Sequence, residues 1–270
     1  MRDAKNEIRT FDALGDGTER IRAIPQQRVI AKMNEYMGRR DYAGAERHLL
    51  YWLQEARMGR DLRGQLTVFN ELVGHYRKTA EREKALKCAD AALELLACLD
   101  FGETISAGTT YVNVATALNA FGEDERALEL FERARPIYES AAHTEPQLLG
   151  GLYNNMALTC AALKRWDEAL ALYDKAMAQM ALAPNGALEQ AITCLNMADL
   201  IDARDGMEDG VREICALGDR AAELLDGPEL PDDGYYAFVC EKCAPSFEYY
   251  GYFADAEKLM GEAERIYAGN

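Results

Sequence analysis

The chain has 270 residues, of which 49% are hydrophobic and 28% are charged, a composition typical of a folded globular protein rather than a disordered one. Its 30 basic and 46 acidic residues give a formal charge of -16, which disfavours nucleic acid and anionic membranes as partners because both are negatively charged. No run approaches the ~18 apolar residues needed to span a bilayer, so we expect a cytoplasmic protein.

Local composition predicts an all-α fold. Only seven prolines occur, alanine and leucine dominate, and β-branched runs bounded by turn residues are hard to find. The seven cysteines are an odd number and are scattered, which indicates a reducing compartment rather than a disulfide framework. We therefore expect most of them to be small buried residues.

Residues 1–24 form a separate N-terminal segment. They contain Gly15 and Gly17 together with spaced apolar residues, a pattern too short for a domain but suited to an amphipathic cap. Two placements remain open at this point. The segment either caps the array that follows or folds back over its binding surface.

A motif centred on a small residue returns along the rest of the chain. Its anchors, in chain order, are Ala45, Ala85, Ala127, Ala169, Val211 in a weaker copy, and Ala256, separated by 40, 42, 42, 42 and 45 residues. Asparagines precede four of the anchors by fourteen or fifteen residues. Each interval holds two helical patterns joined by a turn, which predicts a helix hairpin. The predicted units are about 25–60, 61–101, 102–143, 144–184, 185–227 and 232–268.

The repeat resembles the tetratricopeptide (TPR) family. The resemblance rests on small residues seven apart (Ala127/Ala134, Ala169/Ala176), on aromatics between them, and on the preceding helix around Asn154 and Asn155. Its period of about 42 residues is longer than the common 34 and is similar to the repeats of kinesin light chains and bacterial peptide-sensing regulators. The resemblance implies a right-handed superhelical solenoid of about six antiparallel helix pairs over residues 25–268.

The last unit has three features of its own. A Pro/Gly/Asp-rich linker precedes it, and Pro245 should kink or interrupt its first helix. Its nine aromatic residues predict either additional core or a patch through which the chain forms a homodimer. Cys240 and Cys243 have a metal-like or redox-like spacing, but a structural zinc needs four ligands and no histidine lies nearby, so we expect no metal and two buried thiols.

Long uncharged stretches mark the first helices of three units, at residues 104–122, 146–163 and 190–198. In TPR arrays the first helices line the concave surface, so the resemblance implies a neutral groove lined by Asn and Thr. An amide can pair with both the N–H and the C=O of an extended peptide backbone. The predicted ligand-binding residues are Asn70, Asn113, Asn155, Asn196, Thr109, Thr116, Asn119 and Asn154.

A structural interpretation of the asparagines stays open. Buried amides must find partners, and these could bond the neighbouring repeat and hold the stack in register. The function that we expect is a non-catalytic scaffold for a neutral or basic protein or peptide, without cofactors. The alternatives are a bacterial peptide-sensing regulator lacking its own DNA-binding domain, and a structural homo-oligomer. No catalytic or phosphate-binding motif supports an enzyme.

Overall fold

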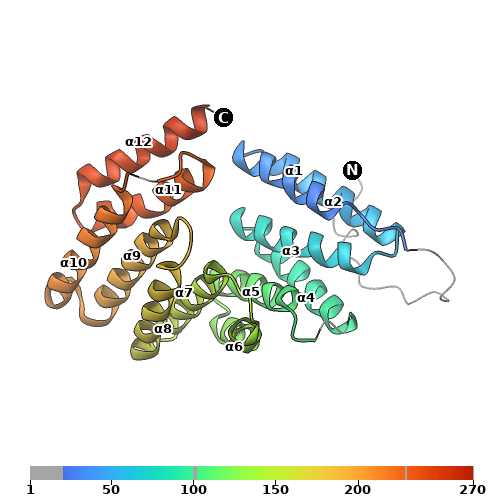
Figure 1. Ribbon diagram of the computed structural model, residues 1–270, viewed down its shortest axis with the longest axis horizontal. Coiled ribbons are helices and arrows are strands. Elements are labelled where there is room, and N and C mark those ends of the chain that lie inside the picture. Colours follow the sequence, from blue (N-terminus) through green and yellow to red (C-terminus); the bar gives the residue numbers. More distant parts are fainter. Residues whose placement is uncertain (1–20, 100–101, 229, 270) are drawn as a thin grey trace. The chain divides into compact units, whose positions relative to one another are not determined.

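The computed structural model describes residues 21–99, 102–228 and 230–269, which form twelve α-helices and no strand (Figure 1). The chain divides into two compact units, Met1–Ala134 and Arg135–Asn270, with the boundary inside α6. The first six helices are α1 (Gln26–Gly38), α2 (Tyr42–Met58), α3 (Leu62–Lys78), α4 (Arg82–Cys98), α5 (Ile105–Ala120) and α6 (Asp124–Ser140). The other six are α7 (Pro146–Ala162), α8 (Trp166–Met180), α9 (Gly186–Asp205), α10 (Met207–Leu225), α11 (Gly234–Tyr249) and α12 (Phe253–Gly269). The fold is an all-α helical repeat, and the predicted fold class is confirmed.

Many helices pack against a neighbour in sequence, and several also contact the next helix but one. In the first unit α3 packs against α2 and α4, and also contacts α1 and α5. In the second unit α9 packs against α8 and α10, and also contacts α7 and α11. The odd-numbered helices of each unit therefore form a continuous layer, which we call the first-helix layer.

Short turns join the helices of most pairs. Three residues separate the helices in these pairs, and the middle residue has a positive φ, as at Ala80 (φ 57), Gly122 (φ 76), Lys164 (φ 59) and Gly251 (φ 87). Glycine adopts this left-handed conformation without strain, whereas alanine and lysine do so at a cost. The turns thus fix the hairpins even where the sequence lacks glycine.

The anchor alanines lie where helices approach closely. Ala45, Ala85, Ala127 and Ala169 are fully buried and Ala256 is 8% exposed. Each is the fourth residue of the second helix of its pair. A small side chain at this position lets the adjacent helix pack closely, and a larger one would be forced into occupied space.

The predicted anchor of the fifth pair is wrong by one residue. Val211 is 49% exposed, and the fourth residue of α10 is the buried Gly210. A Cβ added to Gly210 would lie 2.7 Å from Cγ2 of Ile201, so a glycine fills the anchor position here. The frame shifts because a single residue outside the helices, Gly206 (φ 85), joins α9 to α10 in place of the usual three.

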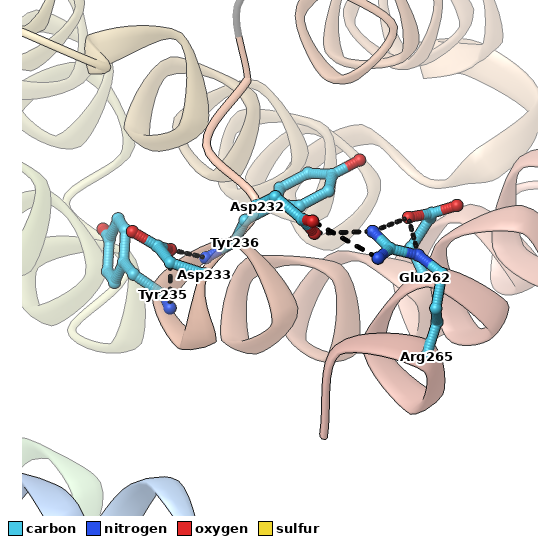
Figure 2. Close-up of polar contacts among 6 residues, drawn as sticks. All are labelled: Asp232, Asp233, Tyr235, Tyr236, Glu262 and Arg265. Carbon is cyan, nitrogen blue, oxygen red and sulfur yellow. Dashed lines mark hydrogen bonds and ion pairs between the residues drawn. The ribbon is translucent and has the colours of Figure 1, made fainter. Parts of the chain in front are cut away.

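The start of α11 is fixed by polar contacts of the last two linker residues. Asp233 caps the helix by accepting hydrogen bonds from the backbone N–H groups of Tyr235 (2.9 Å) and Tyr236 (3.0 Å), as Figure 2 shows. Arg265 of α12 donates to Asp232 at 2.6 Å and to Glu262 at 2.7 Å. These contacts hold the linker end against α12 and set where α11 begins.

Pro245 does not interrupt α11, contrary to one of the two outcomes predicted from the sequence, because the helix runs on to Tyr249. The buried residues Ala244 and Phe247 flank the proline and hold this turn against the core. A proline cannot donate a backbone hydrogen bond, so tertiary packing compensates for the missing bond.

The segment before α1 is described only from residue 21. The Arg22 N–H donates to the Gly59 carbonyl at 2.9 Å, and the Ile24 N–H donates to Asp61 Oδ2 at 2.9 Å. Residues 22–24 thus lie against the turn between α2 and α3. Residues 1–20, on which the prediction of a cap or a groove-filling segment depends, lie outside the described residues.

Candidate functional site

The predicted ligand-binding residues belong to α3, α5, α7 and α9, which are helices of the first-helix layer. Helices α5 and α7 carry no charged residue along their whole length. Their polar character comes from uncharged side chains, mainly of Asn and Thr. The question for each of these side chains is whether the fold already uses its hydrogen-bonding groups.

Asn70 connects two consecutive first helices. Its Nδ2 group donates to Oγ1 of Thr110 at 3.0 Å, which joins α3 to α5. Thr110 is fully buried, and its hydroxyl donates in turn to the Ser106 carbonyl at 3.1 Å. The Oδ1 atom of Asn70 is buried and has no hydrogen-bond partner among the described residues. This amide acts between repeats, as the structural interpretation expects.

Asn154 makes the corresponding connection in the second unit. The side chain is 6% exposed, and its Oδ1 accepts a hydrogen bond from Nδ2 of Asn196 at 3.1 Å. Oγ1 of Thr193 lies 3.2 Å from the same oxygen and 2.8 Å from the Glu189 carbonyl, so its single proton is shared between these two acceptors. We call the contacts Asn70–Thr110 and Asn154–Thr193–Asn196 the amide ladder.

Asn113 of α5 differs from the members of the amide ladder. It is half-buried, and its side chain makes no hydrogen bond within the described part of the chain. Asn155 of α7 is also half-buried, one residue beyond the buried Asn154. Asn113 is therefore the predicted residue whose amide is most available to a ligand.

The remaining predicted residues use their polar groups locally. Oγ1 of Thr109 donates to the Ile105 carbonyl at 3.0 Å, and Oγ1 of Thr116 donates to the Val112 carbonyl at 2.8 Å. Nδ2 of Asn119 donates to Oδ1 of Asp124 at 2.8 Å and ties the end of α5 to the start of α6. Both threonines and Asn119 stay half-buried.

The uncharged character does not extend over the whole of α9. Three carboxylates just outside residues 190–198 accept hydrogen bonds from tyrosines of α11: Glu189 from Tyr235, Asp199 from Tyr250 (2.8 Å) and Asp202 from Tyr249 (3.1 Å). The predicted uncharged stretch, residues 190–198, is thus bordered by negative charge on this helix. The sequence signal for it was present, because the uncharged interval is bounded by acids on both sides.

Desolvation shifts the pKa of two of these acids. It raises the pKa of Glu189, and the nearby Lys242 only partly offsets this. It also raises the pKa of Asp199, which Asp202 raises further while the hydrogen bond from Tyr250 lowers it. Both carboxylates carry their charge at a cost that a nearby cation would reduce.

The described residues give no geometric support for a metal or thiol site. No group of three or more His, Cys, Asp or Glu side chains comes together as ligands in the described ranges. Cys240 and Cys243 are buried and unbonded to each other, and burial raises the pKa of Cys243 to about 12. A thiol with a raised pKa is a poor nucleophile at neutral pH. No helix in the described part of the chain is long and apolar enough to cross a membrane.

Solved structures share this fold. A putative kinesin light chain from Podosopora anserina with nearly identical TPR-like repeats matches with a TM-score of 0.51 and 18% identity, covering 76% of this chain and 96% of that one. BtubC (BKLC) from P. vanneervenii matches with a TM-score of 0.50 and 18% identity, covering 92% of both chains. No family model matches the sequence, and no curated protein matches it. The chain has the fold of a TPR-like repeat protein, and the predicted resemblance is confirmed.

Proposed function

We propose that this protein is a non-catalytic scaffold that binds a protein or peptide along the first-helix layer of its first unit, with Asn113 as a principal contact to the ligand backbone. The observation that carries the proposal is the half-buried amide of Asn113, which lies on an uncharged helix and makes no hydrogen bond within the described residues. An amide in this state offers a donor and an acceptor to an extended chain.

The TPR-like fold supports this proposal because repeat proteins of this kind present extended binding surfaces. The amide ladder supports it in a different way. Asn70, Asn154 and Asn196 are engaged between helices, so they keep the first helices in register and leave the neighbouring positions for recognition. The fold and the proposed site thus use different amides.

The test compares two asparagines with opposite expected roles. Asn154→Ala removes the acceptor of Thr193 and Asn196, and the loss of buried partners should cost about 1–3 kcal/mol of unfolding free energy. Asn113→Ala should change stability by less than about 0.5 kcal/mol, as expected for a side chain away from buried networks.

Ligands are first selected with a phage library of random extended peptides displayed against the folded wild-type protein. Asn113→Ala should then bind the selected peptides about 2- to 12-fold more weakly, the equivalent of one backbone hydrogen bond of ~0.5–1.5 kcal/mol. Equal binding by wild type and Asn113→Ala, or a library that yields no binder, would show that this amide does not recognise a peptide.

A further inference from the structure

The negative charge of the protein is concentrated in its second unit. From Arg135 to Asn270, 10 lysine and arginine residues stand against 24 aspartate and glutamate residues, a formal charge of -14. Residues 1–134 carry 20 basic and 22 acidic residues, a formal charge of only -2. The total of -16 therefore describes the second unit almost alone, and any electrostatic selection of a partner originates there.

Part of this charge lies on one surface together with aromatic rings. Helices α9 and α11 pack against each other (Figure 1). Hydrogen bonds from tyrosines of α11 to carboxylates of α9 show that acids and aromatics meet there. We call this surface the α9–α11 face. Its members are Glu189, Asp199 and Asp202 on α9, and Tyr235, Phe238 and Tyr249 on α11.

The aromatic members are exposed although they lie in regular helix. Tyr235 is 43% exposed, Phe238 is 39% exposed and Tyr249 is 63% exposed. The rings of Tyr235 and Phe238 stack with centroids 6.2 Å apart, and both side chains keep a substantial exposed fraction. The sequence prediction that these aromatics are additional core holds for Tyr236 and Phe247, which are buried, and fails for these three.

The acids of the α9–α11 face are engaged by tyrosine hydroxyls rather than by ion pairs in the described residues, although the positive charge of Lys242 acts on Glu189. Each accepts a hydrogen bond from a tyrosine, which orients the carboxylate and leaves its charge in place. None of the three forms an ion pair within the described residues. Since desolvation already raises the pKa of Glu189 and Asp199, a cation brought to this surface relieves an existing cost.

The spacing along the helices matches an extended chain. Glu189 and Asp199 are ten residues apart on α9, or about 15 Å at the rise of an α-helix. An extended peptide covers that length with about five residues. The Asp233 cap and the Arg265–Asp232 contact fix the start of α11, and with it the position of Tyr235, before any ligand arrives (Figure 2).

We propose that the α9–α11 face binds a lysine- or arginine-rich segment of a partner protein, with the carboxylates pairing with its cations and the exposed rings packing against them. Arginine and lysine are the side chains that bind both to carboxylates and to aromatic faces. This proposal rests on the proposed function as a peptide-binding scaffold and specifies the chemistry of one partner.

One residue of the surroundings opposes such a ligand and supplies a control. Lys242 is exposed on α11, and its positive charge is felt at Glu189. It would repel a basic segment. Lys242→Gln should therefore tighten binding by about two- to threefold, whereas a surface that selects neutral or acidic peptides would be weakened or unaffected by the same change.

Binding is measured by fluorescence anisotropy with a labelled peptide of alternating arginine and glycine, alongside its counterpart in which citrulline replaces each arginine. The arginine peptide should bind, the citrulline peptide should bind at least tenfold more weakly, and added salt should reduce the difference. Equal binding of the two peptides, or no binding of the arginine peptide, would overturn the proposal.

Matched charge variants locate the binding surface. Asp199→Asn with Asp202→Asn keeps acceptors for the tyrosines while removing two charges, and should weaken binding about tenfold. Glu257→Gln with Glu264→Gln removes two charges from exposed positions of α12 and should change it less than twofold. Equal losses in both pairs would mean unspecific attraction to the acidic unit.

The aromatic contribution and two other outcomes are separated in the same series. Tyr249→Leu should weaken binding several-fold, whereas Tyr249→Phe, which keeps the ring, should retain most of the wild-type affinity.

A dimer by light scattering that Tyr249→Asp dissociates would show that a second copy covers this face, and would overturn the proposal. If the arginine peptide does not bind while Asn113-dependent peptides still do, this inference alone is wrong. If no peptide binds, the proposed function is wrong as well.

Discussion

Gly218 of α10 allows a direct measurement of how tightly the last two helix pairs pack. A Cβ at this position would lie 2.7 Å from Cε2 and Cζ of Tyr252 and 2.8 Å from its hydroxyl oxygen. The Tyr252 hydroxyl lies 2.9 Å from the Cys215 carbonyl and 2.8 Å from Oδ1 of Asp219, and the ring meets Phe247 edge-on. The tyrosine is held from several sides and cannot yield without losing contacts.

Two opposing effects decide the outcome of Gly218→Ala. Alanine favours the helix by about 0.5–1 kcal/mol relative to glycine. Overpacking against a held ring costs about 1–3 kcal/mol, and the displaced hydroxyl gives up a hydrogen bond of about 0.5–1.5 kcal/mol. The clash outweighs the helix preference, and we expect a net loss of about 1–3 kcal/mol of unfolding free energy.

Two controls isolate the clash. Gly261→Ala in α12 places its Cβ in open space, so it should stabilise the protein by about 0.5–1 kcal/mol. In a Tyr252→Ala background the clash is gone, and Gly218→Ala should become stabilising by a similar amount. The coupling between the two sites should therefore reach about 2–3 kcal/mol, near the upper end for residues in contact.

The assay is urea unfolding followed by circular dichroism, with the four members of the Gly218/Tyr252 cycle measured under the same conditions. If Gly218→Ala stabilises the wild-type protein as much as Gly261→Ala does, the reasoning is refuted. So would additive effects at Gly218 and Tyr252, because the two side chains would then not compete for the same space.

Two further predictions follow from the backbone and from a buried imidazole. Ala80→Gly should stabilise the protein by about 1 kcal/mol, because alanine is strained at φ 57. Gly122→Ala, at φ 76, should destabilise it by about as much. A melting temperature that falls in Ala80→Gly and rises in Gly122→Ala would contradict the turn geometry. Burial lowers the pKa of His75 below 6.5 despite the neighbouring Glu46 and Glu81, so the unfolded chain binds more protons and stability should fall as pH drops through 6.5. His75→Gln should flatten that fall in urea titrations above and below this pH, and an unchanged slope would exclude His75 as its cause.

The repeat could be predicted from the sequence because one physical requirement recurs at a fixed interval. Every pair needs a small residue where its second helix meets the adjacent helix, and alanine fulfils this need at five of six places. The sixth anchor was predicted at Val211 because a constant spacing of 42 residues was assumed. A turn of unusual length precedes α10, so the anchor is one residue earlier, at Gly210. The longer α9 and the single-residue connection at Gly206 change the frame, and neither follows from the period.

The role of each asparagine could not be predicted from its place in the repeat. Successive residues on a helix differ by about 100° in direction, so Asn154 and Asn155 point to different surroundings although both match the motif. Asn154 is buried and accepts two hydrogen-bond donors of α9, whereas its neighbour is half-buried. The identity of the partner helix and its rotation decide which amide maintains the register, and both depend on tertiary packing.

The two proposed binding modes differ in a physical property that the fold itself creates. Asn113 lies on a helix without charges, so a ligand held by its amide gains hydrogen bonds that depend little on ionic strength. The α9–α11 face presents carboxylates near solvent, and attraction to such charges weakens as the screening length shortens toward ~8 Å at physiological salt. A ligand that binds equally at low and high salt therefore uses uncharged contacts of the kind that Asn113 offers. One that dissociates with salt is held by Glu189, Asp199 or Asp202, or by other acids of the second unit, and the matched pair Glu257/Glu264 tells these apart.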